Sequence, residues 1–382
     1  MPTPATASGA RPAASKKAPG GQAPMAASVP FIRASAKHRE PTGFDVTKTM
    51  TASDQTFTVA EIPAYGYVRY IGILVTASGG TGGSPNVTLT ERGVLAALKN
   101  IYFTEPNGAV IAQFDDSWDM YLANKWGGFA NVVGGDPKNS PAYSNATSSF
   151  AGFSWYLRIP VELNCRDGLG SLPNQNAAAT FKLRMTLAQQ SDLGSGTFPT
   201  TMPNVRVRVF LEAWDQPEIA SGGAANQVSP PAVNTTQFWT SQSYTVNSGQ
   251  NTIRLTRVGN YIRTLLLEME GSTQATQLAD GETIWGNADP VYLYKDARPL
   301  DIIQPTVWKD DMYRKSGYTL NNGIRVYDFN SEFDGTYGHE NRDLWLPTLG
   351  STRLEFQFNA SAAGTLKVLT NDVAITGANV FL

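Results

Sequence analysis

Few side chains of this sequence suit the chemistry that most enzymes use. Among 382 residues, histidine occurs only as His38 and His339, and cysteine only as Cys165. Metal sites built on imidazole, and Ser-His or Cys-His catalytic sets, need such residues close together. A single cysteine cannot form a disulfide within its own chain, so we interpret Cys165 as a small buried thiol. The residue types therefore favour a protein that is not an enzyme and that holds no metal or cofactor.

Adjacent carboxylates remain as candidates for acid–base catalysis. Asp115 with Asp116, and Asp310 with Asp311, can each supply the two carboxylates that glycoside hydrolysis requires. Both pairs lie in segments with helix signals, however. The letters DDS precede WDMYLANKW and two glycines, and residues 305–317 open with proline and close with glycine. Capping of backbone amides and pairing with the helix dipole explain these acids more simply, so we predict two short helices.

An acidic segment near the end of the chain resembles a calcium loop in part. Oxygen-bearing side chains occupy every second position before a glycine, namely Asp328, Asn330, Glu332 and Asp334 before Gly335. Such alternation can wrap a calcium ion. The EF-hand pattern, however, needs Asp or Asn followed by Gly where this chain has Glu332 and Phe333. We interpret the segment as an acidic turn after a strand, and the sequence leaves calcium binding by residues 328–335 open.

The first 43 residues differ from the rest and are predicted to form a flexible arm. Up to Glu40 they are rich in Ala, Pro, Ser and Gly, so they bury too little apolar surface to offset the entropy of ordering. Six basic residues lie there: Arg11, Lys16, Lys17, Arg33, Lys37 and Arg39. The arm carries a charge of about +5, and the formal total of −2 leaves about −7 on the body. This separation favours an anionic partner, with a merely solubilising tail as the alternative.

The residue pattern after the arm predicts antiparallel β-strands. Short runs rich in β-branched and aromatic residues are separated by Gly, Pro, Asn and Asp. In residues 205–212, apolar side chains alternate with Arg206, Arg208, Phe210 and Glu212, the period expected when one face is buried. Asn107-Gly108 predicts a tight type I′ hairpin turn. No run approaches the roughly 18 apolar residues that a membrane helix needs.

The body is predicted to contain two domains of the same kind. Residues 216–237 hold paired glycines and prolines without apolar periodicity, which indicates a linker between domains at 44–215 and 238–382. Similar segments recur in the same order on both sides of it. Residues 71–75 match 263–267 at an offset of 192, residues 101–103 match 291–293 at 190, and residues 119–121 match 311–313 at 192. The repeat predicts six core anchors: Trp118, Met120, Tyr121, Trp308, Met312 and Tyr313.

This pattern resembles the double jelly-roll major capsid proteins. It is most similar to those of tectivirus-like, membrane-containing bacteriophages, in the lineage that includes adenovirus hexons. Residues 67–77, residues 93–128 and the repeat near residues 261–317 carry the resemblance, which covers residues 44–382. The resemblance implies an all-β fold of two tandem eight-stranded antiparallel jelly rolls, with short helices and a flexible N-terminal arm.

The resemblance also implies a structural function. Three copies would form a homotrimer that serves as a pseudo-hexagonal capsomer and tiles an icosahedral shell over an internal membrane. The implied partners are further copies, vertex or penton and minor capsid proteins, and membrane lipids, with no small-molecule substrate. The implied location is the virion capsid shell, assembled in the host cytoplasm. The arm would face the membrane or interior through Arg11, Lys16, Lys17, Phe31, Ile32, Arg33, Lys37 and Arg39.

Two other functions fit parts of the sequence. A β-sandwich carbohydrate-binding protein, with exposed Trp and Tyr stacking on sugar rings, suits the 10% aromatic content. A β-rich glycosidase needs two carboxylates about 5 to 10 Å apart in a groove. Trp118 and Trp308 discriminate between these readings. Burial of both inside the sandwich supports the duplicated scaffold, whereas an open groove lined by them supports sugar binding.

Overall fold

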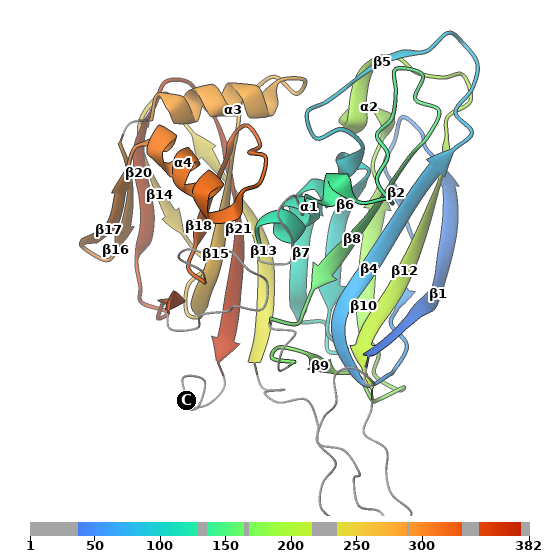
Figure 1. Cartoon of the computed structure of the whole chain (residues 1–382), viewed down its shortest axis with the longest axis horizontal. Helices are drawn as coiled ribbons and strands as arrows, with labels where there is room; N and C mark the ends of the chain where they lie inside the picture. Colours follow the sequence, from blue (N-terminus) through green and yellow to red (C-terminus); the bar gives the residue numbers. More distant parts are fainter. Residues whose placement is uncertain are drawn as a thin grey trace, which may run out of the picture.

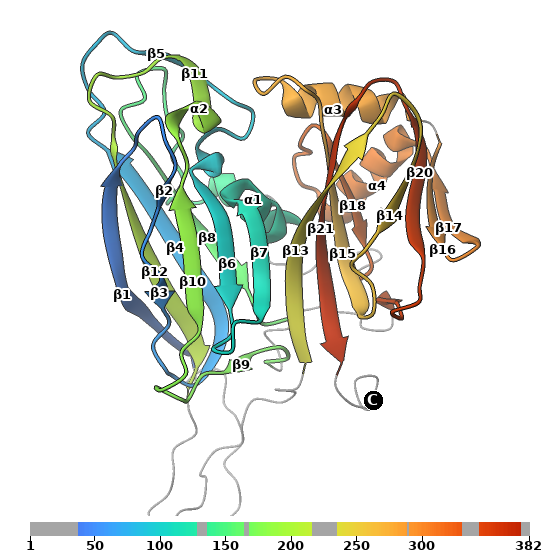
Figure 2. The same cartoon turned by 180° about the vertical axis from the view of Figure 1, so that it is seen from behind.

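A computed structural model describes residues 37–127, 136–163, 168–215, 235–288, 290–330 and 344–375. Two bodies of antiparallel sheet stand side by side, with their strands running along a common direction (Figures 1 and 2). Several positions singled out above lie outside the described residues: Arg11, Lys16, Lys17, Phe31, Ile32, Arg33, Cys165, His339 and residues 331–335.

The first body, called the first roll, has two facing sheets. One sheet contains, in spatial order, β1 (Lys37–Thr49), β12 (Asn204–Trp214), β4 (Tyr67–Ser78) and β8 (Phe153–Pro160). The other contains the short β2 (Gln55–Thr56) and β3 (Ala60–Glu61), then β10 (Lys182–Leu187), β6 (Leu98–Thr104) and β7 (Val110–Asp116). Smaller pairings add β5 (Asn86–Leu89) to β11 (Gly194–Thr197), and β9 (Leu172–Pro173) to β4.

The second roll repeats this order. One sheet contains β13 (Thr235–Val246), β21 (Gly364–Ile375), β15 (Tyr261–Glu270) and β18 (Ile324–Asp328), with β19 (Leu346–Pro347) on β15. The other contains β14 (Gly249–Leu255), β20 (Leu354–Ala360), β16 (Val291–Lys295) and β17 (Arg298–Ile303). With β2 and β3 counted as one strand, and with the short strands β5, β9, β11 and β19 left out, each roll places its first, eighth, third and sixth strands in one sheet and its second, seventh, fourth and fifth in the other. That is a jelly-roll order, so the predicted fold of two tandem rolls is confirmed.

Local sequence explains these strands. In β12 the side chains of Val205, Val207, Val209 and Leu211 have no exposed surface, while Arg206 is exposed, as the alternation predicts. Apolar side chains from both rolls form one continuous hydrophobic cluster.

The two predicted helices are confirmed. Helix α1 (Ser117–Trp126) is capped by the Asp116 carboxylate, which accepts a hydrogen bond from the Asp119 amide, and it ends at Gly127. Helix α4 (Pro305–Ser316) ends at Gly317, whose φ of 65° is left-handed. Each helix follows the fifth strand of its roll. Other helical segments are α2 (Gln190–Leu193), the 3₁₀ turns Gly93–Ala96 and Pro137–Asn139, and α3 (Gln277–Gly286), which the sequence analysis missed.

The hairpin between β6 and β7 differs from the predicted type I′ turn. Only Gly108 of the Asn-Gly pair has a positive φ, 91°. Its amide donates to the Glu105 carbonyl at 2.9 Å, and the Glu105 amide donates to Ala109 at 2.8 Å. The reason is Pro106, whose ring fixes φ near −65° and therefore favours a type I turn followed by a glycine bulge.

Strand β1 begins inside the predicted arm. Residues 37–41 pair with residues 210–214 of β12, and the Arg39 guanidinium lies 3.0 Å from the Glu212 carboxylate. Lys37 and Arg39 are therefore strand residues, which corrects their assignment to a flexible segment. Composition concealed this strand because Lys, Glu and Pro are depleted in strands, whereas β12 supplies backbone partners to any side-chain sequence.

Helix α3 packs on β15 through a glycine, which generates a first prediction. A Cβ added to Gly281 would lie 1.8 Å from the Met269 carbonyl oxygen, whereas one added to Gly286 of the same helix meets nothing within 4 Å. We expect Gly281→Ala to lower the free energy of unfolding by about 1–3 kcal/mol through overpacking. Gly286→Ala should leave it unchanged or raise it by up to about 1 kcal/mol. Urea unfolding of both variants measures this, and equal effects would contradict it.

Candidate functional site

The two rolls are joined by a short parallel strand pairing. Trp239 of β13 lies opposite Ala112 of β7, and Thr240 lies opposite Gln113. This pairing merges one sheet of each roll into a single ten-stranded sheet, visible in Figure 2 as the run from β10 through β7 and β13 to β15. Two pairs of opposing residues are too few to determine how the rolls are placed relative to each other. We therefore take the side chains around this pairing as the candidate site.

Helix α1 is enclosed at this boundary. Nine of its ten residues are buried, whereas α4, at the same position in the second roll, buries only Pro305, Trp308 and Met312. The second roll covers α1, and nothing in the chain's described part covers α4 in the same way. Figure 1 shows α1 between the rolls and α4 on the outside of the second.

The six repeat anchors differ in burial between the two helices. Trp118, Met120 and Tyr121 have no exposed surface, and Trp308 and Met312 are 3% and 5% exposed. Tyr313 is 56% exposed, so the expectation that it lies in the core is wrong. The reason is its face of α4, which points away from the second roll.

The two anchor tryptophans line no open groove. Each buried indole N–H has a partner inside the protein, Trp118 on the Glu268 carboxylate at 3.1 Å and Trp308 on the Val326 carbonyl at 2.9 Å. Trp308 also packs against Trp285 and Tyr327. Neither ring is available for stacking on a sugar, which disfavours the carbohydrate-binding reading at these positions.

Buried charges cross the boundary in both directions. We call them the ionic junction: Arg92, Asp116, Asp119, Glu268, Glu270 and Lys367. Arg92 of the first roll binds Glu268 of the second at 2.9 Å and also contacts Glu270. Lys367 of the second roll lies 2.8 Å from the Asp119 carboxylate of α1. Each roll thus supplies one cation to carboxylates of the other.

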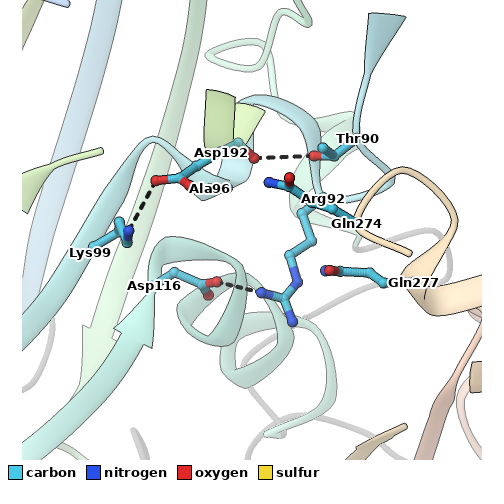
Figure 3. A pocket seen from close by; sticks show the side chains of 8 residues that line it. All are labelled: Thr90, Arg92, Ala96, Lys99, Asp116, Asp192, Gln274 and Gln277. Carbon is cyan, nitrogen blue, oxygen red and sulfur yellow. Dashed lines mark hydrogen bonds and ion pairs between the residues drawn. The ribbon is translucent and has the colours of Figure 1, made fainter. Parts of the chain in front are cut away.

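Asp116 connects these two exchanges. Its carboxylate lies 2.9 Å from the Arg92 guanidinium and 3.9 Å from the Lys367 ammonium, and it also caps α1. Figure 3 shows the Arg92–Asp116 bond beside the cavity described below. The carboxylate that begins the helix therefore also fixes the helix against the second roll.

The electrostatics of the junction follow from burial. Burial raises the pKa of Asp119 to about 7, and the Asp116 and Glu268 carboxylates add to this while Lys367 opposes it. Burial alone would lower the pKa of Lys367, but Asp116 and Asp119 hold it well above its ordinary value. Burial also raises the pKa of Glu268, against the effect of Arg92. With four carboxylates facing two cations, a proton on Asp119 reduces the excess negative charge.

Further polar contacts hold both ends of the boundary. The Lys125 side chain of α1 has no exposed surface; its ammonium lies 2.8 Å from the Asn321 amide oxygen and 3.0 Å from Asp136. Burial lowers the pKa of Lys125, opposed by Asp136. In α3, the Leu278 and Ala279 amides donate to the Glu91 carboxylate of the first roll at 2.6 and 2.9 Å. The first roll therefore caps a helix of the second.

A cavity of about 220 Å³ opens beside the junction. Its walls are Thr90, Arg92, Ala96, Lys99, Asp116, Asp192, Gln274 and Gln277 (Figure 3). Both cations there are already paired, since Lys99 lies 2.9 Å from Asp192 and Arg92 binds the junction carboxylates. Within the described ranges, no group of three or more His, Cys, Asp or Glu side chains is placed to hold a metal ion.

Three of the remaining acidic candidates have partners within the protein. Asp115 accepts a hydrogen bond from the Ser241 hydroxyl at 2.8 Å, and Asp310 pairs with Arg314 one helical turn later at 2.7 Å. Capping does not explain Asp310 and Asp311, because both lie beyond the first turn of α4, and that first turn contains no acid. The Asp328 carboxylate accepts from the Asn330 amide at 3.0 Å, while the rest of that acidic segment lies outside the described residues. Across the described ranges, none of the helices is long and apolar enough to cross a membrane.

Comparison with known proteins identifies the architecture. The major capsid protein of Bacteriophage PM2 aligns with a TM-score of 0.54 at 9% identity, over 90% of this chain and 100% of that chain. The STIV major capsid protein aligns with a TM-score of 0.59 at 11% identity, over 88% of this chain and 96% of that chain. The chain has the double jelly-roll fold of viral major capsid proteins.

A further structural match has the same fold, whereas the sequence comparisons find no match. The PBCV-1 virus capsid model aligns with a TM-score of 0.54 at 10% identity, over 88% of this chain and 93% of that chain. No family model and no curated protein matches the chain. The double jelly-roll fold therefore persists in this chain at an identity too low for sequence comparison to detect.

Sequence reasoning missed the junction itself. Asp116 was recognised as a cap, but Arg92, Glu268 and Lys367 were not singled out. A signal was present, because Glu268 interrupts LLLEME and Lys367 interrupts TLKVL, both of them apolar strands. A charge at a buried strand position needs a partner, although the sequence does not say which.

The junction generates a second prediction. We expect Lys367→Met to lower the free energy of unfolding by about 3–5 kcal/mol, because it leaves a buried carboxylate unpaired. Lys99→Met serves as the matched control, since Lys99 also bridges two carboxylates but its side chain is 31% exposed. The control should cost no more than about 1 kcal/mol. Denaturant unfolding of both variants decides, and similar losses would show that burial of the charge is unimportant.

Proposed function

We propose that this chain is a viral major capsid protein that forms homotrimeric, pseudo-hexagonal capsomers. The observation that carries the proposal is the duplication: one chain presents two rolls of identical strand order, locked side by side by the ionic junction. Three such chains supply six equivalent blocks, which is what a pseudo-hexagonal unit requires. The likeness in fold to capsid proteins supports the same role.

The shell is the setting of the proposal. Capsomers tile an icosahedral capsid of the virion over an internal membrane, after assembly in the host cytoplasm, and penton and minor capsid proteins complete the vertices. A low charged content of 16% suits a chain whose surface is largely covered by neighbours, because Lys and Glu are depleted in interface cores. The subunit acts through its surfaces and not through catalysis.

Assembly is the direct test and the third prediction. Purified full-length protein should run in native mass measurement and sedimentation as a discrete trimer of three times 41.2 kDa, or as shell-like particles. Large obligate interfaces should keep the trimer intact from low to moderate salt. A strict monomer at every concentration would contradict the capsid proposal. A glycan-binding screen would then test the carbohydrate-binding hypothesis.

The arm has a proposed role at the membrane. Strand β1 begins at the end of the molecule where β21 finishes (Figure 2), so the described fold starts at one end of the rolls. Their basic side chains face anionic lipid in this proposal, with Phe31 and Ile32 as apolar anchors. Arg39 contributes less, because it pairs with Glu212.

Vesicle flotation gives the fourth prediction. The full chain should bind phosphatidylserine vesicles, and replacing Arg11, Lys16, Lys17 and Arg33 by Gln should weaken binding roughly a thousandfold, at about 1 kcal/mol per charge. Replacing the exposed body residues Arg184 and Arg254 by Gln is the control and should have little effect. Equal binding by the arm variant, or no binding by any form, contradicts the membrane role of the arm.

A further inference from the structure

The contact between the rolls uses a different element from each. The first roll contributes its fifth strand, β7, and helix α1, and the second roll contributes its first strand, β13. The corresponding elements that remain are β17 with α4 on the second roll and β1 on the first. Both β17 and β1 are edge strands in the described sheets.

The β17–α4 face is unusually apolar for a free surface. Seven large hydrophobic side chains are exposed among the described residues, and four of them lie on β17 and α4. They are Leu300 at 39%, Ile302 at 56%, Val307 at 49% and Tyr313 at 56%. Clustered exposed apolar side chains mark protein interaction sites.

The repeated triplet shows what is missing from this face. Met120 and Met312, at the same position of the repeat, are both buried. Tyr121 is buried, with its hydroxyl donating to Asp136 of its own roll at 3.0 Å, whereas its counterpart Tyr313 is exposed. The triplets have the same sequence, Asp-Met-Tyr, so the difference in burial comes from what lies over each helix. Residues 136–138 of the first roll and Glu268 and Asn321 of the second lie over α1, whereas α4 keeps an exposed outer face.

We propose that the β17–α4 face binds the β1 edge of a second copy of this chain, as β7 and α1 bind β13 within one copy. The inference rests on the proposed capsid function and specifies the contact that builds the trimer. Strands β17 and β1 lie at opposite ends of the molecule (Figures 1 and 2), so each copy can use one of each. Such a head-to-tail contact closes into a ring when its rotation permits.

The repeat fixes which residue of β17 occupies the central position. Gln113 of β7 lies opposite Tyr102 in β6. The offset of 190 aligns Tyr102 with Tyr292, and Tyr292 lies opposite Ile302 in β17. Ile302 therefore takes the place of Gln113.

The same reasoning fixes the position on β1. Within one copy, the partner of Gln113 is Thr240 of β13. Thr240 pairs with Thr370, and Thr370 pairs with Leu265. The repeat aligns Leu265 with Ile73, which pairs with Val209. The Thr42 hydroxyl donates to the Val209 carbonyl at 3.1 Å, which places Thr42 beside Val209. Ile302 of one copy is thus expected beside Thr42 of the next.

Cysteine cross-linking tests this register and is the fifth prediction. In a Cys165→Ser background, Thr42→Cys combined with Ile302→Cys should give covalent dimers and trimers on oxidation or with a short bismaleimide, and each single variant should give none. Thr42→Cys with Thr252→Cys is the matched control, because Thr252 is exposed on β14 at the opposite edge of the same sheet. The control should not cross-link.

The outcomes separate this inference from the proposed function. A trimer by native mass in which positions 42 and 302 do not cross-link, or in which 42 and 252 cross-link equally well, overturns the interface and leaves the capsid proposal standing. A monomer overturns both. As a second measurement, Ile302→Glu should abolish the trimer peak, whereas Thr252→Glu should retain it, with circular dichroism confirming that both variants are folded.

Discussion

The exchange of buried opposite charges between the rolls is the interaction on which the rest of the structure depends. The parallel pairing of β7 and β13 is too short to orient two sandwiches, and the apolar contacts around it have no direction of their own. Arg92 and Lys367 add direction, because each must meet carboxylates of the other roll or remain buried without compensation. One relative placement of the rolls satisfies both cations, so the junction selects it.

This selection gives helix α1 two tasks that its counterpart does not have. Asp116 caps the helix and binds both junction cations, so the start of α1 is fixed by the second roll as well as by its own. Lys125 fixes the other end through Asn321. Helix α4 has the same place in its roll but keeps an exposed outer face. The two helices therefore hold the same place in their rolls, one of them enclosed and the other with an exposed outer face.

Local patterns in the sequence predicted the parts of the fold that local physics decides. The alternation in β12, the cap of α1, and the proline start and glycine stop of α4 need only neighbours along the chain, and all are confirmed. The 107–108 turn failed because Pro106 overrode the Asn-Gly preference. The junction was not predictable in this way: Arg92 and Glu268 are 176 residues apart, and only the tertiary arrangement pairs them. Tyr121 and Tyr313 have the same local sequence and opposite burial.

The difference between these two tyrosines bears on how a duplicated chain assembles. In the assembly we propose, each roll has one contact surface at its fifth strand and another at its first. The contact between β7 and β13 within one chain uses one surface of each kind, and the edge strands β1 and β17 remain at the two ends. Among these free surfaces the β17–α4 face is the apolar one, through side chains such as Ile302 and Val307, and in our proposal a further copy of the chain covers it. Inside the chain, the buried charge pairs of the ionic junction hold the two rolls together, and this contact needs no second copy.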